Sequence, residues 1–106
     1  MWKKTLPIVD EQELLKRARA GNERAYEQVI LAYTPALYQA VRRLLQDDTQ
    51  IELILQETFW RAWQSLDRWA AGQPVLPYLT GIAMNLVRER WRANGRLMDG
   101  IEENHP

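Results

Sequence analysis

The sequence contains no cysteine and no long apolar stretch, and each absence excludes a class of protein. Without cysteine the chain can form neither a disulfide framework nor a thiolate metal site. No apolar run approaches the roughly 20 residues that a membrane-spanning helix requires. Residues 1–10 are too short and too interrupted to form the core of a signal peptide. We therefore expect a cytoplasmic protein.

Residues that carry catalytic chemistry are also scarce. The only histidine, His105, is the penultimate residue, and the only serine, Ser65, has no histidine near it in the sequence. A carboxylate metal site in a helical bundle would need Glu-x-x-His pairs, and the sequence has none. It also lacks a glycine-rich phosphate loop. We therefore expect a protein that is not an enzyme and that binds neither a metal nor a cofactor.

The composition is that of one small globular domain. The 106 residues are 46% hydrophobic and 26% charged, which is enough to build a single core. The formal net charge is zero, but Arg88, Arg90, Arg92 and Arg96 lie close together with only Glu89 among them. Such a local basic stripe can bind phosphates, because the surface field is set by charges within about 8–10 Å.

Apolar residues recur at the three- and four-residue spacing of helices, and no segment has the pattern of a strand. The spacing predicts helices over residues 10–20, 23–45 and 49–67. A loop at 70–74 precedes a fourth helix that carries Pro77 in its first turn, where proline is tolerated, and extends to about residue 94. We therefore expect an all-α fold, a compact bundle of about four helices. Its parts are an N-terminal extension at 1–9, the helical domain at 10–96 and a disordered tail at 97–106.

Four residues are expected to shape the helix ends and interior. Asp10 has the side chain of an N-cap for the first helix. Pro35 lies inside the second, so we expect a kink or break near residues 33–34. Thr49 and Glu52 form the T-x-x-E pattern of a capping box, which predicts Thr49 as the N-cap of the third helix.

The same periodicity predicts which side chains face the core. The expected inward residues are Leu14, Leu15, Ala18, Tyr26, Val29, Ile30, Tyr33, Leu37, Tyr38, Val41, Leu44, Leu45, Ile51, Ile54, Leu55, Phe59, Ala62, Trp63, Leu66, Tyr78, Leu79, Ile82, Ala83 and Leu86. Trp91 is left open between the core and the surface.

Three stretches of the sequence are similar to a known family. Residues 14–27 read LLKRARAGNERAYE, residues 56–63 read QETFWRAW, and residues 78–92 read YLTGIAMNLVRERWR. In this order and spacing they resemble region 2 of the extracytoplasmic-function sigma factors, within the sigma-70 family. The resemblance covers about residues 10–96 and implies a helical domain that acts in transcription initiation.

The resemblance implies a contact with RNA polymerase. In the family, the helix that carries the Gln-Glu pair docks on a coiled coil of the clamp-forming largest subunit of the polymerase core. The residues implied for this contact are Glu52, Gln56, Glu57, Phe59 and Trp60. The alternative is that Phe59 belongs to the core and that Gln56 and Glu57 are only a solvated face.

The resemblance also implies a contact with promoter DNA. The fourth helix and the loop before it would hold the single-stranded non-template strand of the minus-ten element, with one base flipped into a pocket. The residues implied for DNA binding are Tyr78, Asn85, Arg88, Arg90, Trp91 and Arg92. Arginines supply cations, aromatic rings supply stacking faces, and the amide of Asn85 can read a base edge. The alternative is that the arginines are only the exposed side of an amphipathic helix.

The sequence departs from the family pattern just before residue 56. Family members usually carry several acids there, whereas this chain has Gln50, Ile51 and Leu53 and keeps only Glu52. One subgroup that lacks the same acids is paired with a Ser/Thr kinase, and a phosphothreonine supplies the charge. Thr49 is the candidate for this phosphorylation, with Thr58 as a second candidate that lies in the middle of the helix. The alternative is that Thr49 is only a helix cap.

Two further functions stay open. One is a degenerate sigma-like helical module that binds a protein partner such as an anti-sigma factor without binding DNA. The other is an unrelated ligand-binding regulator, which would need a sizeable internal pocket. The expected partners are the RNA polymerase core, single-stranded promoter DNA, and a Ser/Thr kinase or anti-sigma factor, but no membrane. Family members normally continue into a second helical domain, so the chain is either an excised domain or a protein without that half.

Overall fold

The computed structural model describes residues 11–69 and 72–102, with side chains as far as residue 94. These residues form α1 (Glu11–Arg19), α2 (Glu23–Arg42), α3 (Asp48–Gln64), the short 3-10 helix η2 (Leu66–Arg68) and α4 (Val75–Glu102). The described residues contain no strand, which confirms the all-α prediction. Asp10 and His105 lie outside them.

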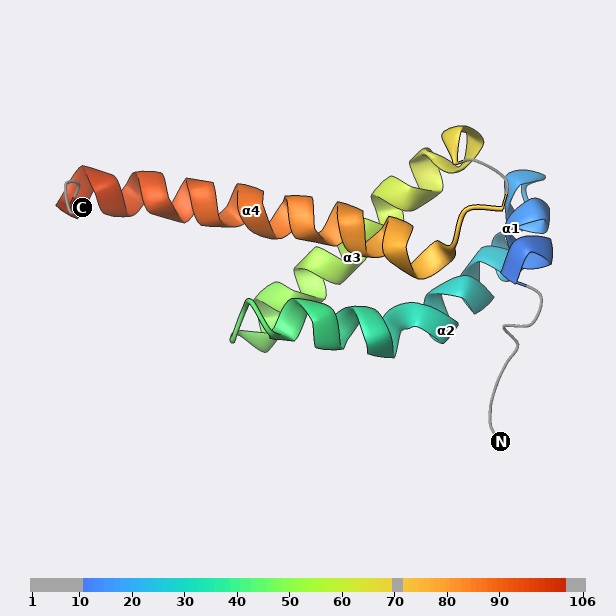
Figure 1. Ribbon diagram of the computed structural model, residues 1–106, viewed down its shortest axis with the longest axis horizontal. Coiled ribbons are helices and arrows are strands. Elements are labelled where there is room, and N and C mark those ends of the chain that lie inside the picture. The colour runs from blue at the N-terminus through green and yellow to red at the C-terminus, as the bar shows by residue number, and fades with distance from the viewer. Residues whose placement is uncertain (1–10, 70–71, 103–106) are drawn as a thin grey trace.

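The helices are arranged around α3. It packs against both α2 and α4, and α2 and α4 also contact each other. Figure 1 shows α4 crossing α3 and continuing well beyond the bundle. The small helix α1 lies at the opposite end of the bundle, beside the start of α4. The helical backbone of α4 continues to Glu102, past the point where the sequence pattern predicts a tail.

The turn between α1 and α2 follows from two residues. Gly21 has a φ of 100°, a left-handed conformation that favours glycine, and it ends α1. Asn22 then caps α2, since its side-chain oxygen accepts a hydrogen bond from the backbone N–H of Ala25 at 3.1 Å. This short turn holds α1 against the N-terminal half of α2.

The second helix is continuous through Pro35, so of the predicted kink or break, the break is absent. Proline cannot donate a hydrogen bond to the carbonyl of Leu31, and both residues lie on the exposed side of α2. Water can therefore satisfy that carbonyl. The helix ends at Arg42 rather than at the predicted Leu45, and the chain turns there, with the N–H groups of Leu44 and Leu45 both donating to the carbonyl of Val41, at 2.9 and 3.0 Å.

The cap of α3 differs from the prediction. Asp47 is the N-cap, and its carboxylate accepts a hydrogen bond from the N–H of Thr49 at 2.9 Å. Thr49 itself is already inside the first turn of the helix, and its side chain is exposed. A carboxylate two residues earlier competes successfully with the threonine hydroxyl because it is charged and lies at the positive end of the helix dipole.

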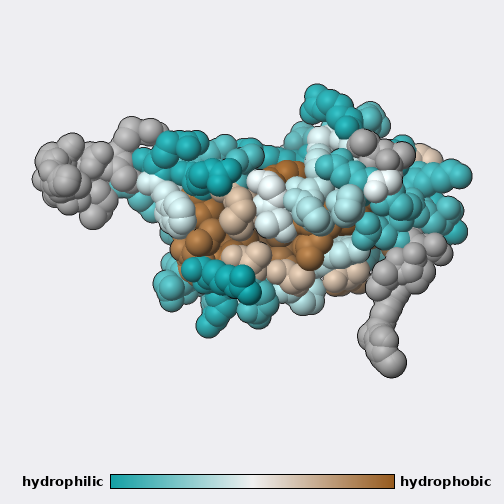
Figure 2. Space-filling view, in the orientation of Figure 1, coloured by the Kyte–Doolittle hydropathy of each residue, from teal (hydrophilic) through white to brown (hydrophobic). Residues whose placement is uncertain are grey.

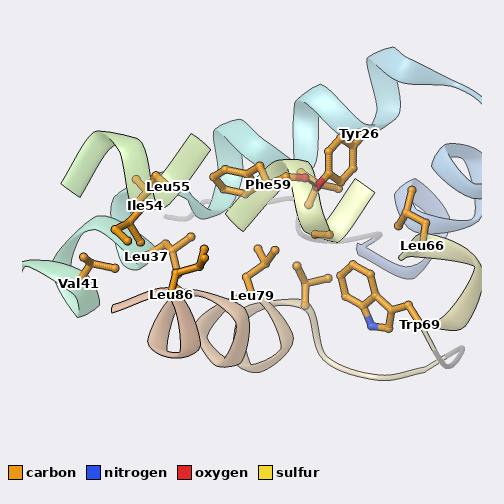
Figure 3. Close-up of a cluster of buried hydrophobic side chains, with 14 of the residues drawn as sticks. Tyr26, Leu37, Val41, Ile54, Leu55, Phe59, Leu66, Trp69, Leu79 and Leu86 are labelled. Atoms are coloured by element: carbon orange, nitrogen blue, oxygen red, sulfur yellow. Dashed lines mark hydrogen bonds between the residues drawn. The ribbon is translucent and has the colours of Figure 1, made fainter. Parts of the chain in front are cut away.

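The core is formed by one continuous cluster from all four helices, as Figure 3 shows for its central part. Most of the predicted inward residues are buried or packed against it, but Leu44 is 38% exposed. Four fully or almost fully buried apolar residues were not predicted: Ala25, Trp69, Val75 and Val87. Thr58 is also buried and donates its hydroxyl to the carbonyl of Ile54 at 2.7 Å, so it is inaccessible to a kinase in the folded protein.

Replacing Pro35 by alanine tests the account of α2. Pro35→Ala restores a helical donor at an exposed site, and we expect the free energy of unfolding to rise by about 1–2 kcal/mol. Urea unfolding followed by circular dichroism measures this. Gln39→Ala, one turn later on the exposed side, is the control and should change little. A loss of stability in Pro35→Ala would show that packing depends on the proline.

Candidate functional site

The residues implied for polymerase binding divide into two groups on α3. Glu52, Gln56 and Glu57 are exposed, and Trp60 is 56% exposed, so these four share an accessible surface. Phe59 is only 7% exposed and belongs to the core, which corrects its assignment to the docking surface. The reason is helical spacing: Phe59 falls in line with the buried Ile51 and Leu55, four residues apart.

A groove lies between α3 and α4, with a volume of about 650 Å³. We call it the α3–α4 groove. Leu53, Ile54, Trp60 and Leu86 are among its apolar lining residues, and Glu57, Arg61, Glu89 and Arg90 are among its polar ones. Figure 2 shows apolar surface below α4, in the space toward α2 on the face in view. The groove places apolar contact surface directly beside the exposed Gln56 and Glu57.

Arg61 joins the two walls of this groove. Its guanidinium lies 3.1 Å from the carboxylate of Glu57 on α3 and 3.8 Å from that of Glu89 on α4. All three side chains are substantially exposed, so each pair contributes little to stability. Their effect is to fix the positions of the three charged groups relative to the groove.

A second, smaller cleft lies where the end of α3 faces the start of α4. Its volume is about 370 Å³, and we call it the polar cleft. It is lined by Arg61, Gln64, Ser65, Arg68, Tyr78, Ile82 and Asn85. Amides, hydroxyls and two guanidinium groups thus surround an apolar patch at Ile82, an arrangement suited to a flat polar molecule beside an anionic group.

The walls of the polar cleft are held by side-chain contacts. The ring of Tyr78 stacks on that of Trp69, with centroids 4.1 Å apart and an interplanar angle of 23°. The hydroxyls of Tyr78 and Ser65 are hydrogen bonded to each other. At the other side, a guanidinium nitrogen of Arg88 donates to the side-chain oxygen of Asn85. Trp69 is almost fully buried, so it gives Tyr78 a fixed support.

The structure separates the residues implied for DNA binding. Asn85, Arg88 and Arg92 are exposed and share one side of α4, as their spacing of three and four requires. Tyr78 is half-buried in the polar cleft. Arg90 instead lines the α3–α4 groove and is separated from this surface. Trp91 is 46% exposed, which places it on the surface rather than in the core.

Sequence reasoning missed Arg61, Gln64 and Arg68, which line the polar cleft from the side of α3 and η2. They recur at spacings of three and four within residues 61–68, a segment in which the buried residues are Ala62 and Leu66. This stripe of polar residues could have indicated a polar surface at the end of the third helix, but the family resemblance implied DNA-binding residues only from Tyr78 onward.

Three tyrosine hydroxyls tie the helices together. Tyr26 donates to the carbonyl of Phe59 at 2.6 Å, which links α2 to α3, and burial raises the pKa of Tyr26 above its ordinary value. Burial and a hydrogen bond to Glu11 likewise raise the pKa of Tyr33. Tyr38 donates to Asp48 at 2.6 Å, and this bond raises the pKa of Tyr38. All three therefore remain neutral donors at physiological pH.

Comparison with known proteins identifies the family. The family described as Sigma-70 region 2 matches residues 29–97. The chain belongs to this family. The match confirms the resemblance to sigma-70 region 2 that was drawn from the sequence. Among the helices that the structure describes, none has the length and apolar character needed to cross a membrane.

The relatives of this region 2 are sigma factors. RNA polymerase sigma factor CnrH of Cupriavidus metallidurans is 33% identical over 74% of this chain and 41% of its own length. ECF RNA polymerase sigma factor SigW of Bacillus subtilis is 30% identical over 74% of this chain and 42% of its own length. The chain thus spans less than half of these relatives.

Solved structures agree with the fold. CnrH in complex with the cytosolic domain of CnrY superposes with a TM-score of 0.71, at 32% identity over 83% of this chain and 58% of that one. An engineered region 2 of sigmaE in complex with GTAAAA superposes with a TM-score of 0.77 over 92% of this chain and 99% of that one. At 22% identity, the second likeness supports the fold alone.

Phe59 and its neighbour Trp60 give a direct test of the corrected surface. Phe59→Ala removes a buried ring and should lower the free energy of unfolding by about 3–5 kcal/mol. Trp60→Ala removes a ring that is mostly in solvent and should cost less than about 1 kcal/mol. Urea unfolding of the two variants measures both values. Equal losses would contradict the assignment of Phe59 to the core and Trp60 to the surface.

Proposed function

We propose that this region 2 docks on the RNA polymerase core through α3 and binds the single-stranded minus-ten element of promoters through α4. This is a binding function without a catalytic step. The observation that carries it is the polar cleft, which stands next to Asn85, Arg88 and Arg92 in a chain of the sigma-70 region 2 family.

The DNA-binding part follows from the chemistry of that surface. Arg88 and Arg92 are exposed cations on one side of α4, where a phosphate backbone can follow the helix. The adjacent polar cleft offers the ring of Tyr78 for stacking and the amides of Asn85 and Gln64 for a base edge. A strand that runs along α4 would therefore reach the cleft with one unstacked base.

The polymerase-binding part uses the exposed surface of α3. Gln56, Glu57 and Trp60 lie together along the α3–α4 groove, and Glu52 lies one turn before Gln56. Charge on such a surface steers association and fixes register with a basic partner. Between Asp48 and Gln56 this surface has one acid, Glu52, and Leu53 is 47% exposed beside it.

We further propose that phosphorylation of Thr49 supplies the missing charge. Thr49 is exposed in the first turn of α3, where the helix dipole favours an anion, and it precedes Glu52 by three residues. Asp47 and Asp48 stand beside it and oppose the added charge, although Arg42, 3.6 Å from Asp48, offsets part of this. The kinase would be a Ser/Thr kinase. Thr58 does not compete for this role because it is buried.

A second candidate function is a module that binds an anti-sigma factor without binding DNA. The observation that favours it is the apolar lining of the α3–α4 groove, with Leu53 and Trp60 half in solvent. The relative CnrH has been solved in complex with the cytosolic domain of CnrY. Such a module would need the groove but not the basic side of α4.

Charge reversal on α4 distinguishes the two functions. Arg88→Glu with Arg92→Glu should weaken binding of a labelled single-stranded oligonucleotide at least about tenfold. The slope of log K against log salt should also fall by about 1.4, because two phosphate contacts are lost. Fluorescence anisotropy at several salt concentrations measures both.

The matched control changes net charge equally on another face. Arg24→Glu with Arg43→Glu replaces two exposed arginines of the α2 region, so general electrostatics change by the same amount. This control should bind nearly as tightly as the unaltered chain. If both double variants lose affinity equally, or if the unaltered chain does not bind, the DNA-binding proposal fails and the protein-binding module takes its place.

Thr49 is tested with polymerase core and the chain in two states. Stoichiometric phosphorylation at Thr49 should tighten binding about tenfold or more, because a phosphate can form one to three charge-assisted hydrogen bonds. Titration of labelled chain against the core measures the affinities. Thr49→Val, treated with the same kinase, serves as control. Equal, tight binding of both states would contradict the proposed phosphorylation switch and leave Thr49 only a structural role in α3. No binding in either state would overturn the docking proposal.

A further inference from the structure

The small helix α1 lies outside residues 29–97, the part that matches the family. None of its residues is among those proposed to contact DNA or polymerase. It contacts instead the connection between α3 and α4. Glu11, Gln12 and Arg19 of α1 hydrogen bond to the backbone on both described flanks of that connection, at residues 66–69 and 72–75. Figure 1 shows α1 beside both flanks.

Arg19 holds the first flank. Its Nε donates to the carbonyl of Leu66 at 3.2 Å, and one terminal nitrogen donates to the carbonyl of Trp69 at 2.9 Å. Both bonds are partly buried and charge-assisted, and the planar guanidinium fixes the two carbonyls relative to each other. A lysine has one nitrogen at its tip and cannot reproduce this geometry.

Gln12 and Glu11 hold the second flank. The side-chain oxygen of Gln12 accepts from the N–H of Gly72 at 2.9 Å, and its nitrogen donates to the carbonyl of Gln73 at 3.1 Å. The carboxylate of Glu11 accepts from the N–H of Val75, the first residue of α4, at 3.1 Å. The hydroxyl of Tyr33 donates to the other oxygen of the same carboxylate. Glu11 therefore caps α4 from a different helix.

The two flanks determine the shape of the polar cleft. Trp69, whose carbonyl Arg19 holds, carries the ring on which Tyr78 stacks, and Figure 3 shows this ring at one end of the core. Tyr78 follows Val75 by three residues in the first turn of α4. Displacing either flank therefore moves the ring of Tyr78, which lines the cleft together with its hydrogen-bonded partner Ser65.

We propose that Glu11, Gln12 and Arg19 are positioning residues for base recognition: they set the geometry of the polar cleft, and so its selectivity among bases, without touching DNA. This inference rests on the proposed DNA-binding function. A helix at the rim of the domain thereby becomes part of promoter recognition through five side-chain hydrogen bonds to backbone.

The test compares two arginines of the same helix. Arg19→Lys keeps the charge but loses the double contact, whereas Arg17→Lys alters an exposed arginine whose partner is Glu13 on α1 itself. Gln12→Ala, with the exposed Gln28→Ala of α2 as control, removes the two contacts of Gln12 to the second flank and leaves that of Glu11. Urea unfolding verifies that each variant of the chain is folded.

The readout is base preference rather than affinity. The unaltered chain first selects a preferred strand from a randomised single-stranded DNA library, and affinities are then measured for that strand and its single-base variants. Arg19→Lys and Gln12→Ala should reduce discrimination at the position read by the cleft about fivefold or more, since a well-placed base contact supplies at least that factor. Arg17→Lys and Gln28→Ala should keep it.

Each other outcome counts against the inference. Unchanged discrimination in Arg19→Lys and Gln12→Ala, or an equal loss of affinity for every strand, would show that α1 only stabilises the fold, while the proposed DNA binding would stand. Failure of the unaltered chain to bind any strand of the library would overturn the proposed function and this inference together.

Discussion

The burial of one face of α3 between α2 and α4 is the constraint on which the rest of this domain depends. Ile51, Ile54, Leu55, Phe59 and Ala62 are buried there, and each large side chain contributes about 1.5–3 kcal/mol by leaving water. Residues three and four positions apart share a face of a helix, so the residues between the buried ones point away from the core together. This burial therefore leaves Glu52, Gln56, Glu57 and Trp60 exposed on the opposite face of α3. The docking surface is thus a consequence of the core.

The crossing of α3 and α4 places the two clefts next to each other. Arg61 lines both the α3–α4 groove and the polar cleft, and it pairs with carboxylates on both helices. A partner that occupies the groove and displaces Glu57 or Glu89 would change the charge that Arg61 presents to the polar cleft. The two proposed binding events therefore share a side chain, although their remaining contacts lie on different surfaces.

Much of the site was predictable from the sequence, and the failures have identifiable causes. The family resemblance named Asn85, Arg88 and Arg92, and all three are exposed on one side of α4. The family resemblance assigned Phe59 to a surface that its own periodicity with Ile51 and Leu55 contradicts. Thr49 was predicted as a cap from the local capping-box pattern, but the carboxylate of Asp47, two residues earlier, takes that place. Local periodicity was therefore the better guide for Phe59, whereas for Thr49 two local patterns competed and the charged cap prevailed.

The sequence by itself determined the all-α class, the inward face of each helix and the family, because helical periodicity and capping depend on residues within a few positions of one another. Only the tertiary structure decided that Arg90 lines the α3–α4 groove while Arg88 bonds to Asn85 of the polar cleft, that Trp69 supports Tyr78, and that α1 holds the start of α4. Arg19 and Trp69 are 50 positions apart, and Glu11 and Val75 are 64. Contacts at such separations depend on how complete helices pack, and no local pattern in the chain encodes them.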